Sequence, residues 1–245
     1  MSRAEFDQNF PYGLDRPRQA RGTLSAGMGL GVLALVLAFV LGDLGGPNGL
    51  VVLVLLIAFV ATFVVSAGLF RTSRTTKVKA ADRMLDGLDL NGDERAVDLG
   101  CGTGLLCAGL AVRLPEGSVV GVDSWVENDL QPTGRAVAKQ TLQLAGVKKV
   151  SILTGSVREL PLADASMDLA VSRDVLASLP SKDARREAIA ELARVVVPGG
   201  RVTLLEPFRS RELAALLTAA GFSDVQRSAR WWILMPPHRL VTAKR

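Results

Sequence analysis

The stretch Val97-Asp98-Leu99-Gly100-Cys101-Gly102-Thr103-Gly104 decides the fold of this chain, because it joins a short apolar run to a turn in which every second residue is glycine. Without a Cβ, Gly100, Gly102 and Gly104 let the backbone take positive φ angles and approach a ligand closely. The apolar residues of 105–114 recur at helical spacing and predict a helix there. The first N–H groups of this helix would point at the turn. The sequence therefore predicts a strand, a ligand-binding turn and a helix, with a plain strand-to-helix connection as the alternative.

The next apolar run ends in an acid. Residues 118–122 have the composition of a strand, and Asp123 follows them about 20 residues beyond the glycine turn. A carboxylate at this place suits the two hydroxyls of a ribose. A helix N-cap or a turn acid is the alternative role of Asp123.

The spacing of the turn separates two classes of cofactor. A dinucleotide site of the form GxGxxG has a third small residue where this chain has Leu105, and it usually has an apolar residue in place of Asp98. Residues 98–104 resemble instead the first motif of class I S-adenosylmethionine-dependent methyltransferases. In that family the turn holds the amino acid end of the cofactor, and the acid after the second strand holds the ribose.

Later segments extend the resemblance to the end of the chain. Residues 153–162 are similar to the family segment beside the adenine, although Ser156 replaces the usual Asp. The other similar segments are the fourth strand at 166–172, the helix, Pro-Gly-Gly turn and fifth strand at 191–201, and the last helix and strands at 219–225 and 239–244.

The resemblance implies an α/β fold, a doubly wound and mostly parallel seven-stranded Rossmann-like sheet, here preceded by two transmembrane helices. Alternating strand and helix patterns favour the same arrangement. The expected strands lie near 95–99, 118–122, 149–154, 167–172, 201–205, 225–230 and 238–243.

The resemblance also implies that the chain binds S-adenosylmethionine and releases S-adenosylhomocysteine. We expect Asp98 to contact the cofactor ammonium or to hydrogen-bond the glycine loop. We expect Trp125 to stack on the adenine, to face the substrate or to pack in the core. The expected cofactor-binding residues are Asp98, Gly100, Cys101, Gly102, Thr103, Gly104, Asp123, Ser124, Trp125, Ser156, Val157 and Arg173.

The sequence leaves the catalytic residue unknown. Attack on an activated methyl group needs chiefly alignment, and a base is needed only when the acceptor loses a proton. Many relatives have a histidine shortly after the fourth strand, but residues 175–179 contain none. Asp174, Arg173 and His238 are the candidates; a helix cap is the alternative for Asp174, and a structural or surface role for His238.

Two uncharged apolar stretches, 23–41 and 50–70, are each long enough to cross a hydrocarbon core of about 30 Å as a helix. The short turn 43–49 joins them into a hairpin, and the first stretch lacks the small-residue cleavage site of a signal peptide. The positive-inside rule places the N-terminus and the catalytic domain in the cytoplasm, as expected of a bacterial-type inner or plasma membrane protein. The basic residues that flank the spans are Arg3, Arg16, Arg18, Arg21, Arg71, Arg74, Lys77 and Lys79.

The chain is thus predicted to contain a cytoplasmic N-terminal segment (1–22), a transmembrane hairpin (23–70), a linker with a covering helix (71–94) and a cofactor-binding domain (95–245). The short linker keeps the active site near the bilayer, which favours a small hydrophobic acceptor such as a quinone, an isoprenoid or a lipid head group. The net charge of +5 fits basic residues beside anionic lipid, so no nucleic acid partner is expected.

Three smaller patterns complete the sequence predictions. Gly27 and Gly31 form a GxxxG pattern that allows close helix contact, within the hairpin or in a homodimer. Residues 231–235 form an apolar patch that lies at a membrane interface or at a buried sheet edge. Cys101 and Cys107, with His238 far away in sequence, predict neither a disulfide nor a metal site.

The sequence favours a membrane-anchored methyltransferase. The alternatives are a membrane sensor or scaffold that binds S-adenosylmethionine without catalysis, and a nicotinamide-dependent oxidoreductase.

Overall fold

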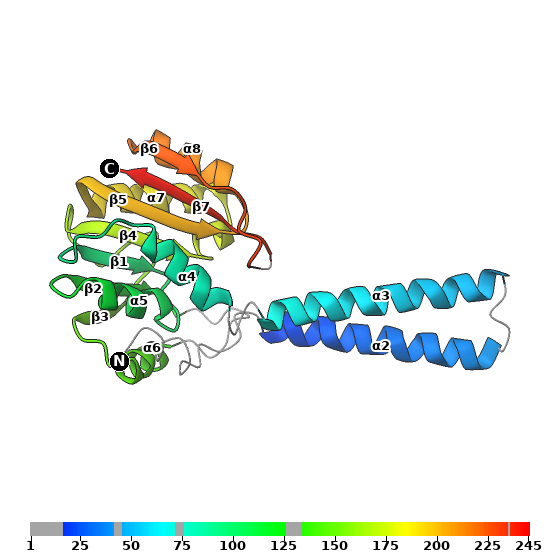
Figure 1. The fold of residues 1–245 in the computed structure, drawn as a ribbon. Helices are drawn as coiled ribbons and strands as arrows, with labels where there is room; N and C mark the ends of the chain where they lie inside the picture. Colours follow the sequence, from blue (N-terminus) through cyan, green and yellow to red (C-terminus); the bar gives the residue numbers. More distant parts are fainter. Residues whose placement is uncertain (1–16, 42–45, 72–75, 126–133, 235) are drawn as a thin grey trace. The chain divides into compact units, whose positions relative to one another are not determined.

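The computed structural model describes residues 17–41, 46–71, 76–125, 134–234 and 236–245. The chain divides into two compact units, one helical and one of mixed α/β structure, and each is described by itself (Figure 1).

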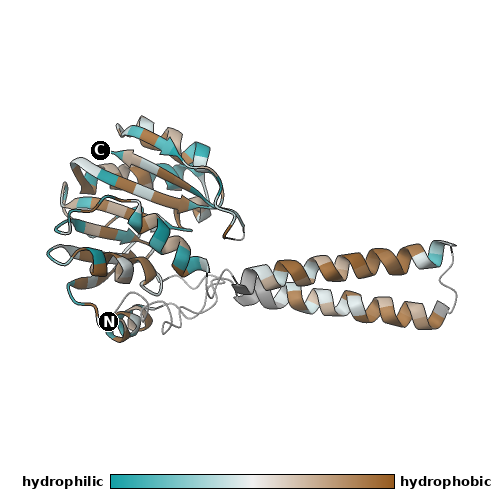
Figure 2. Ribbon diagram, viewed as in Figure 1, coloured by the Kyte–Doolittle hydropathy of each residue, from teal (hydrophilic) through white to brown (hydrophobic). Residues whose placement is uncertain are grey.

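The helical unit is a pair of long helices, α2 (Pro17–Leu41) and α3 (Gly46–Arg71), that pack side by side (Figure 1). Both are long and apolar enough to cross a membrane, and Figure 2 shows the apolar residues along them. A Cβ at Gly27 would lie 2.5 Å from Thr62 Oγ1, and one at Gly31 would lie 3.0 Å from the Phe59 ring. The GxxxG face therefore packs against α3, the first of the two contacts that the sequence left open.

The α/β unit is built on a seven-stranded sheet of order β3-β2-β1-β4-β5-β7-β6. The first five strands are parallel, and β7 runs antiparallel to both of its neighbours. The predicted mixed seven-stranded Rossmann-like sheet is confirmed. Its strands are β1 (Arg95–Leu99), β2 (Ser118–Asp123), β3 (Val150–Thr154), β4 (Met167–Arg173), β5 (Val196–Glu206), β6 (Ser223–Arg227) and β7 (Arg239–Lys244).

Helices cover both faces of the sheet, as the apolar strands require. One buried cluster joins the sheet to α4 (Lys77–Asp86), α5 (Leu105–Arg113) and α6 (Arg135–Leu144). The other joins it to α7 (Lys182–Val195), α8 (Ser210–Ala219) and a short 3₁₀ turn, η2 (Leu176–Ser178).

Three predicted elements have bounds that differ from the structure by more than one residue. The covering helix, expected within 71–94, already ends at Asp86, because Gly87 is its C-cap and Asp89 has a φ of 46°. The strand predicted at 201–205 begins at Val196, with the Pro-Gly-Gly turn inside it as an irregularity of the β4–β5 register. The strand predicted at 225–230 is the shorter β6, which ends at Arg227.

Candidate functional site

The carboxyl ends of the parallel strands form one edge of the sheet, and the predicted site residues gather there. Leu99 at the end of β1 pairs with Val122 of β2 and with Ser172 of β4. The residues that directly follow these three positions therefore lie side by side, and they include the glycine turn and Asp123. This edge is where open α/β sheets bind their ligands.

The glycine turn has the backbone that the sequence predicted. Gly100, Gly102 and Gly104 have φ angles of 67°, 50° and 86°. A Cβ at Gly100 would lie 2.3 Å from Cγ2 of Val175, whereas a Cβ at Gly102 would have no atom within 4 Å. Gly100 is thus required by packing, and Gly102 faces open space above the turn.

Asp123 holds this turn from the neighbouring strand. Its Oδ2 accepts a hydrogen bond from the N–H of Gly102 at 2.9 Å, and its Oδ1 accepts one from the N–H of Trp125 at 2.9 Å. A carboxylate accepts about four hydrogen bonds, so capacity remains for ribose hydroxyls. The bond to Trp125, two residues on, is the contact of a turn acid, one of the alternative roles of Asp123. The other alternative, a helix cap, is not seen among the described residues, where the next helix has Gly134 as its N-cap.

The residues after β2 and β3 complete the edge. The indole N–H of Trp125 donates to Thr154 Oγ1 at 2.9 Å, and the ring packs against the core around α5. Ser156 Oγ accepts a local hydrogen bond from the N–H of Arg158 at 3.1 Å, and Val157 packs against the second core cluster. Packing is therefore the observed role of Trp125, while Ser124 is exposed beside Asp123.

Asp98 lies beneath the turn and is buried. Its Oδ2 accepts a hydrogen bond from the thiol of Cys107 at 3.3 Å, a partner that the sequence analysis did not consider. Burial raises the pKa of Asp98 to about 7. Cys101 and Cys107 are free and buried, and a Cβ at Gly121 would lie within 3 Å of both sulfurs. Cys101 therefore turns its side chain inward and offers only its backbone to a ligand.

The candidate catalytic residues Asp174 and His238 are paired, although 64 positions separate them. The distance from His238 Nε2 to Asp174 Oδ1 is 2.7 Å, and that from His238 Nδ1 to the carbonyl oxygen of Pro236 is 2.6 Å. Asp174 Oδ2 also lies 3.3 Å from Nε of Arg173. Because a carbonyl only accepts, Nδ1 is the donor in the contact with Pro236.

Two of the alternatives for this pair are now decided. Asp174 is not a helix cap, because Val175 is the N-cap residue of η2 and no side chain bonds that cap. Asp174 instead takes a φ of 64° and turns toward His238. His238 is buried, so it is not a surface residue.

Glu206, at the end of β5, was missed by the sequence analysis. Its Oε1 accepts hydrogen bonds from the N–H groups of Val175 and Leu176, and its Oε2 has no partner among the described residues. Burial, followed by the nearby charge of Asp174, raises the pKa of Glu206 to about 8. An acid that directly follows an apolar strand was the available signal.

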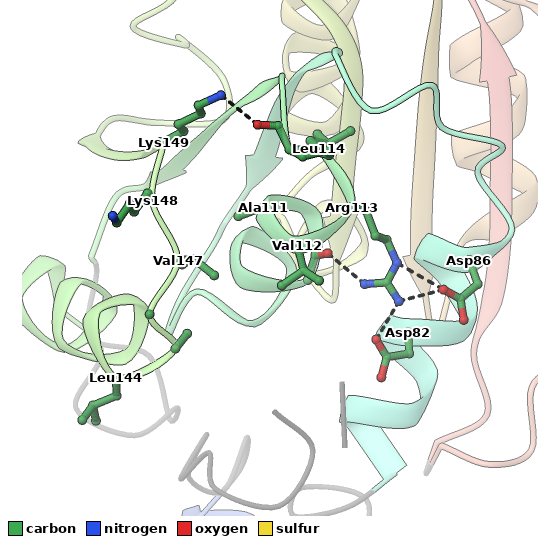
Figure 3. A pocket seen from close by; sticks show the side chains of 14 residues that line it. Asp82, Asp86, Ala111, Val112, Arg113, Leu114, Leu144, Val147, Lys148 and Lys149 are labelled. Atoms are coloured by element: carbon green, nitrogen blue, oxygen red, sulfur yellow. Dashed lines mark hydrogen bonds and ion pairs between the residues drawn. The ribbon is translucent and has the colours of Figure 1, made fainter. Parts of the chain in front are cut away.

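A cavity of about 630 Å³ lies at the opposite edge, where α5 ends and β3 begins (Figure 3). Arg113 lines it and donates to Asp82, Asp86 and the carbonyl oxygen of Gly109. Lys149 donates to the carbonyl oxygen of Pro115 on its other side. None of the predicted cofactor residues lines this cavity, so it is separate from the glycine turn.

Comparison with known proteins agrees with this geometry. Residues 97–204 match the family described as a methyltransferase domain. An uncharacterized methyltransferase of Schizosaccharomyces pombe is 35% identical over 46% of this chain and 40% of its own length. A protein of Bacillus cereus named demethylmenaquinone methyltransferase is 34% identical over 49% of this chain and 47% of its own length. The chain spans less than half the length of these curated relatives.

Solved structures share the fold. A SAM-dependent methyltransferase from Aquifex aeolicus has a TM-score of 0.54 and 17% identity over 69% of this chain and 96% of its own. A protein titled a [4+2]-cyclase has a TM-score of 0.59 and 18% identity over 71% of this chain and 83% of its own. The sheet order and the glycine turn agree with this match: residues 97–204 carry a methyltransferase domain, for which S-adenosylmethionine is the cofactor.

Proposed function

We propose that this protein is a membrane-anchored enzyme that transfers a methyl group from S-adenosylmethionine to a small hydrophobic acceptor in the membrane, with an isoprenoid quinone as the first choice. The observation that carries the proposal is the position of Asp123, whose carboxylate lies against the N–H of Gly102 in an open glycine turn. A methyltransferase needs this pair to hold the ribose and the amino acid end of the cofactor.

The residues at the carboxyl edge fit S-adenosylmethionine. Asp123 has acceptor capacity for two hydroxyls, and the space above Gly102 is open. The first N–H groups of α5 favour an anionic group such as the cofactor carboxylate. The bound cofactor would supply an electrophilic methyl group on a sulfonium, so the residues of the chain have mainly to align the acceptor with it.

If the methyl acceptor must lose a proton, we assign Asp174 as the carboxylate that takes it. It follows β4 at the cofactor edge, and its side chain is 30% exposed. His238 and Arg173 hold its two oxygens and so fix its orientation. A quinol ring that is methylated on carbon must release a proton, which is the chemistry for which a positioned carboxylate helps.

The anchor is supported by the exposure of the helical pair. Only 11% of each apolar window in α2 and α3 is buried, and Phe39 is 90% exposed. Helices of a water-soluble core would bury such side chains, whereas lipid would cover them. We infer that α2 and α3 cross the membrane and that both ends of the hairpin lie in the cytoplasm.

The acceptor class rests on the anchor and on one relative. A chain held at the bilayer meets lipid-soluble molecules at high local concentration. The relative from Bacillus cereus is named for demethylmenaquinone, an acceptor of this kind.

The test is transfer of label from radioactive S-adenosylmethionine by the full chain in lipid nanodiscs. The purified protein is offered reduced demethylmenaquinone, total membrane extract and cytosolic extract separately, with Asp123→Ala as the control. We expect label in the organic phase with the first two and none with the variant. Label only in the aqueous or protein fraction would support methyl transfer by this chain but refute a lipid-soluble acceptor.

A sensor that binds S-adenosylmethionine without transfer is the second candidate. Two departures from the family pattern favour it: Ser156 stands in place of the usual Asp, and residues 175–179 contain no histidine. Binding of S-adenosylhomocysteine without label in any fraction would support this candidate over the enzyme.

A further inference from the structure

The loop between β6 and β7 presents large apolar side chains at the cofactor edge. Trp232 is 74% exposed, and Ile233 is 39% exposed. Phe208, which follows β5, is 54% exposed. We call Phe208, Trp232 and Ile233 the apolar rim.

The strand register fixes the edge at which the rim lies. Arg239 at the start of β7 pairs with Glu206 at the end of β5, and Arg227 at the end of β6 pairs with Val241. The loop of residues 228–238 therefore projects from the same edge as the glycine turn. Phe208 leaves β5 two residues after Glu206 and shares that edge.

The exposed side chains project from an ordered loop. Trp231 and His238 exchange backbone hydrogen bonds, N–H to O, at 2.7 and 3.3 Å. The guanidinium of Arg83 lies 4.8 Å from the centre of the Trp231 ring, and Leu234 is 3% exposed. Trp231 and Leu234 thus anchor the loop from within and leave Trp232 and Ile233 outside. Of the two locations predicted for the patch 231–235, the buried sheet edge is correct for Leu234. Met235 lies outside the described residues.

One arginine lies over a residue of the rim, and Arg227 and Arg239 flank the rim's loop in the sequence. The guanidinium of Arg230 lies 6.0 Å from the centre of the Trp232 ring. Burial, followed by the like charges of Arg239 and Arg211, lowers the pKa of Arg227. Exposed tryptophan with arginine beside it is the composition of a surface that contacts anionic lipid head groups.

Chain connectivity limits how far this edge can be from a bilayer. Leu85 of α4 packs at Gly109 of α5, and Asp86 binds Arg113 at the end of α5, so the last turn of α4 lies toward the opposite edge. The first turn of α4 therefore lies toward the cofactor edge. Arg71 at the end of α3 and Lys77 at the start of α4 are six residues apart, so the chain between them reaches at most about 22 Å.

We propose that the apolar rim rests in the head-group region of the membrane and holds the cofactor edge against the lipid surface. This proposal rests on the membrane hairpin of the proposed function and adds a second contact that the domain makes by itself. Trp232 and Ile233 enter the interface, and the neighbouring arginines meet lipid phosphates. A lipid-soluble acceptor then reaches the edge beside Asp174 without crossing water.

Quenching of tryptophan by brominated lipid tests the contact. The full chain is placed in nanodiscs of anionic phospholipid, with or without bromine on the upper acyl carbons. We expect bromine to lower the emission by about one third, because one of the chain's three tryptophans is within reach of the lipid. Trp232→Phe should abolish the difference, and Trp125→Phe should retain it.

A second variant tests whether any exposed tryptophan on the domain would be quenched, wherever it lies. Leu144 ends α6 beside the cavity at the opposite edge and is 62% exposed. Leu144→Trp in the Trp232→Phe background should give emission that bromine does not quench. Equal quenching of the two positions would mean that the domain has no preferred face, which overturns the proposal.

Other outcomes separate the two proposals. A wild-type chain that stays in the discs but shows no bromine effect refutes the rim and leaves the hairpin intact. A blue-shifted Trp232 emission without quenching would indicate burial by another protein or a second copy, and it also refutes the rim. A chain that does not copurify with the discs refutes the hairpin and the rim together.

Discussion

The carboxylate of Asp123 accepts a hydrogen bond from the backbone N–H of Gly102, with 2.9 Å between oxygen and nitrogen, and so ties the end of β2 to the turn after β1. The same carboxylate accepts from the N–H of Trp125. One side chain thus orders the glycine turn and the start of the next segment while it still has acceptor capacity for a ligand. This relationship gives the first prediction.

Asp123→Asn should weaken binding of S-adenosylhomocysteine by about 10- to 100-fold, because hydrogen bonds to a charged group contribute roughly 1.5–3 kcal/mol. An amide has one carbonyl oxygen in place of two carboxylate oxygens, so it cannot keep both backbone donors in their present geometry. Isothermal titration of the full chain in nanodiscs measures the affinity. Asp93→Asn, at an exposed position before the start of β1, is the matched control and should bind normally. An Asn variant with unchanged affinity would remove Asp123 from the ribose site.

Gly100→Ala and Gly102→Ala should have different effects, although both positions have positive φ angles. At Gly100 the new methyl group would overlap Val175, so we expect a loss of roughly 2–5 kcal/mol of folding stability. At Gly102 the methyl group enters open space, so the domain should fold with a loss of about 1–2 kcal/mol but bind cofactor poorly. Thermal unfolding and cofactor titration together distinguish the two effects. Equal stability of the two variants would contradict the packing role of Gly100.

Much of this site follows from the sequence because its elements are close in the chain. The turn, α5 and Asp123 belong to one strand–helix–strand unit, so glycine spacing and one acid were enough to predict them. The membrane-length helices were predictable from uninterrupted apolar runs.

The pair of Asp174 and His238 could not be predicted in this way. His238 reaches Asp174 only because β7 pairs antiparallel with β5 and returns to the cofactor edge. From the sequence, the two residues are separate candidates, and a local helix cap is the alternative for Asp174. Glu206 was missed for a similar reason, since its partners Val175 and Leu176 follow a different strand.

Glu206 should make the folded domain less stable as pH rises from about 4.5 to about 8. Within this range the folded chain holds a proton on Glu206 that the unfolded chain has released, so increasing pH favours unfolding. Glu206→Gln mimics the protonated acid and should flatten the pH dependence of the unfolding midpoint in this range. Asp98→Asn should remove a further part of the slope, between pH about 4 and about 7, because the pKa of Asp98 is also raised. A Glu206→Gln variant with the wild-type slope would show that the carboxyl group is ionised in the folded chain.

Arg113 should hold α4 against α5. Its side chain is 16% exposed and donates to Asp82, Asp86 and the carbonyl oxygen of Gly109. Arg113→Met should destabilise this contact by about 1–3 kcal/mol and increase hydrogen exchange in α4. Arg186→Met breaks the exposed pair with Asp183 and serves as the control, with an expected cost below about 1 kcal/mol. Unchanged exchange in α4 of the Arg113 variant would show that the apolar contacts of α4 are sufficient.

The hairpin should have both ends on the cytoplasmic side, and cysteine labelling can test this in intact cells. Asn48→Cys, in the first turn of α3, should react with a membrane-impermeant maleimide added from outside. Ser73→Cys, beyond the end of α3, should react only after the membrane is opened. The native Cys101 and Cys107 are 6% and 0% exposed, so the wild-type chain should give little background. Labelling of Ser73→Cys from outside would reverse the orientation and separate the domain from the cytoplasmic pool of S-adenosylmethionine, so the proposed function would fail with it.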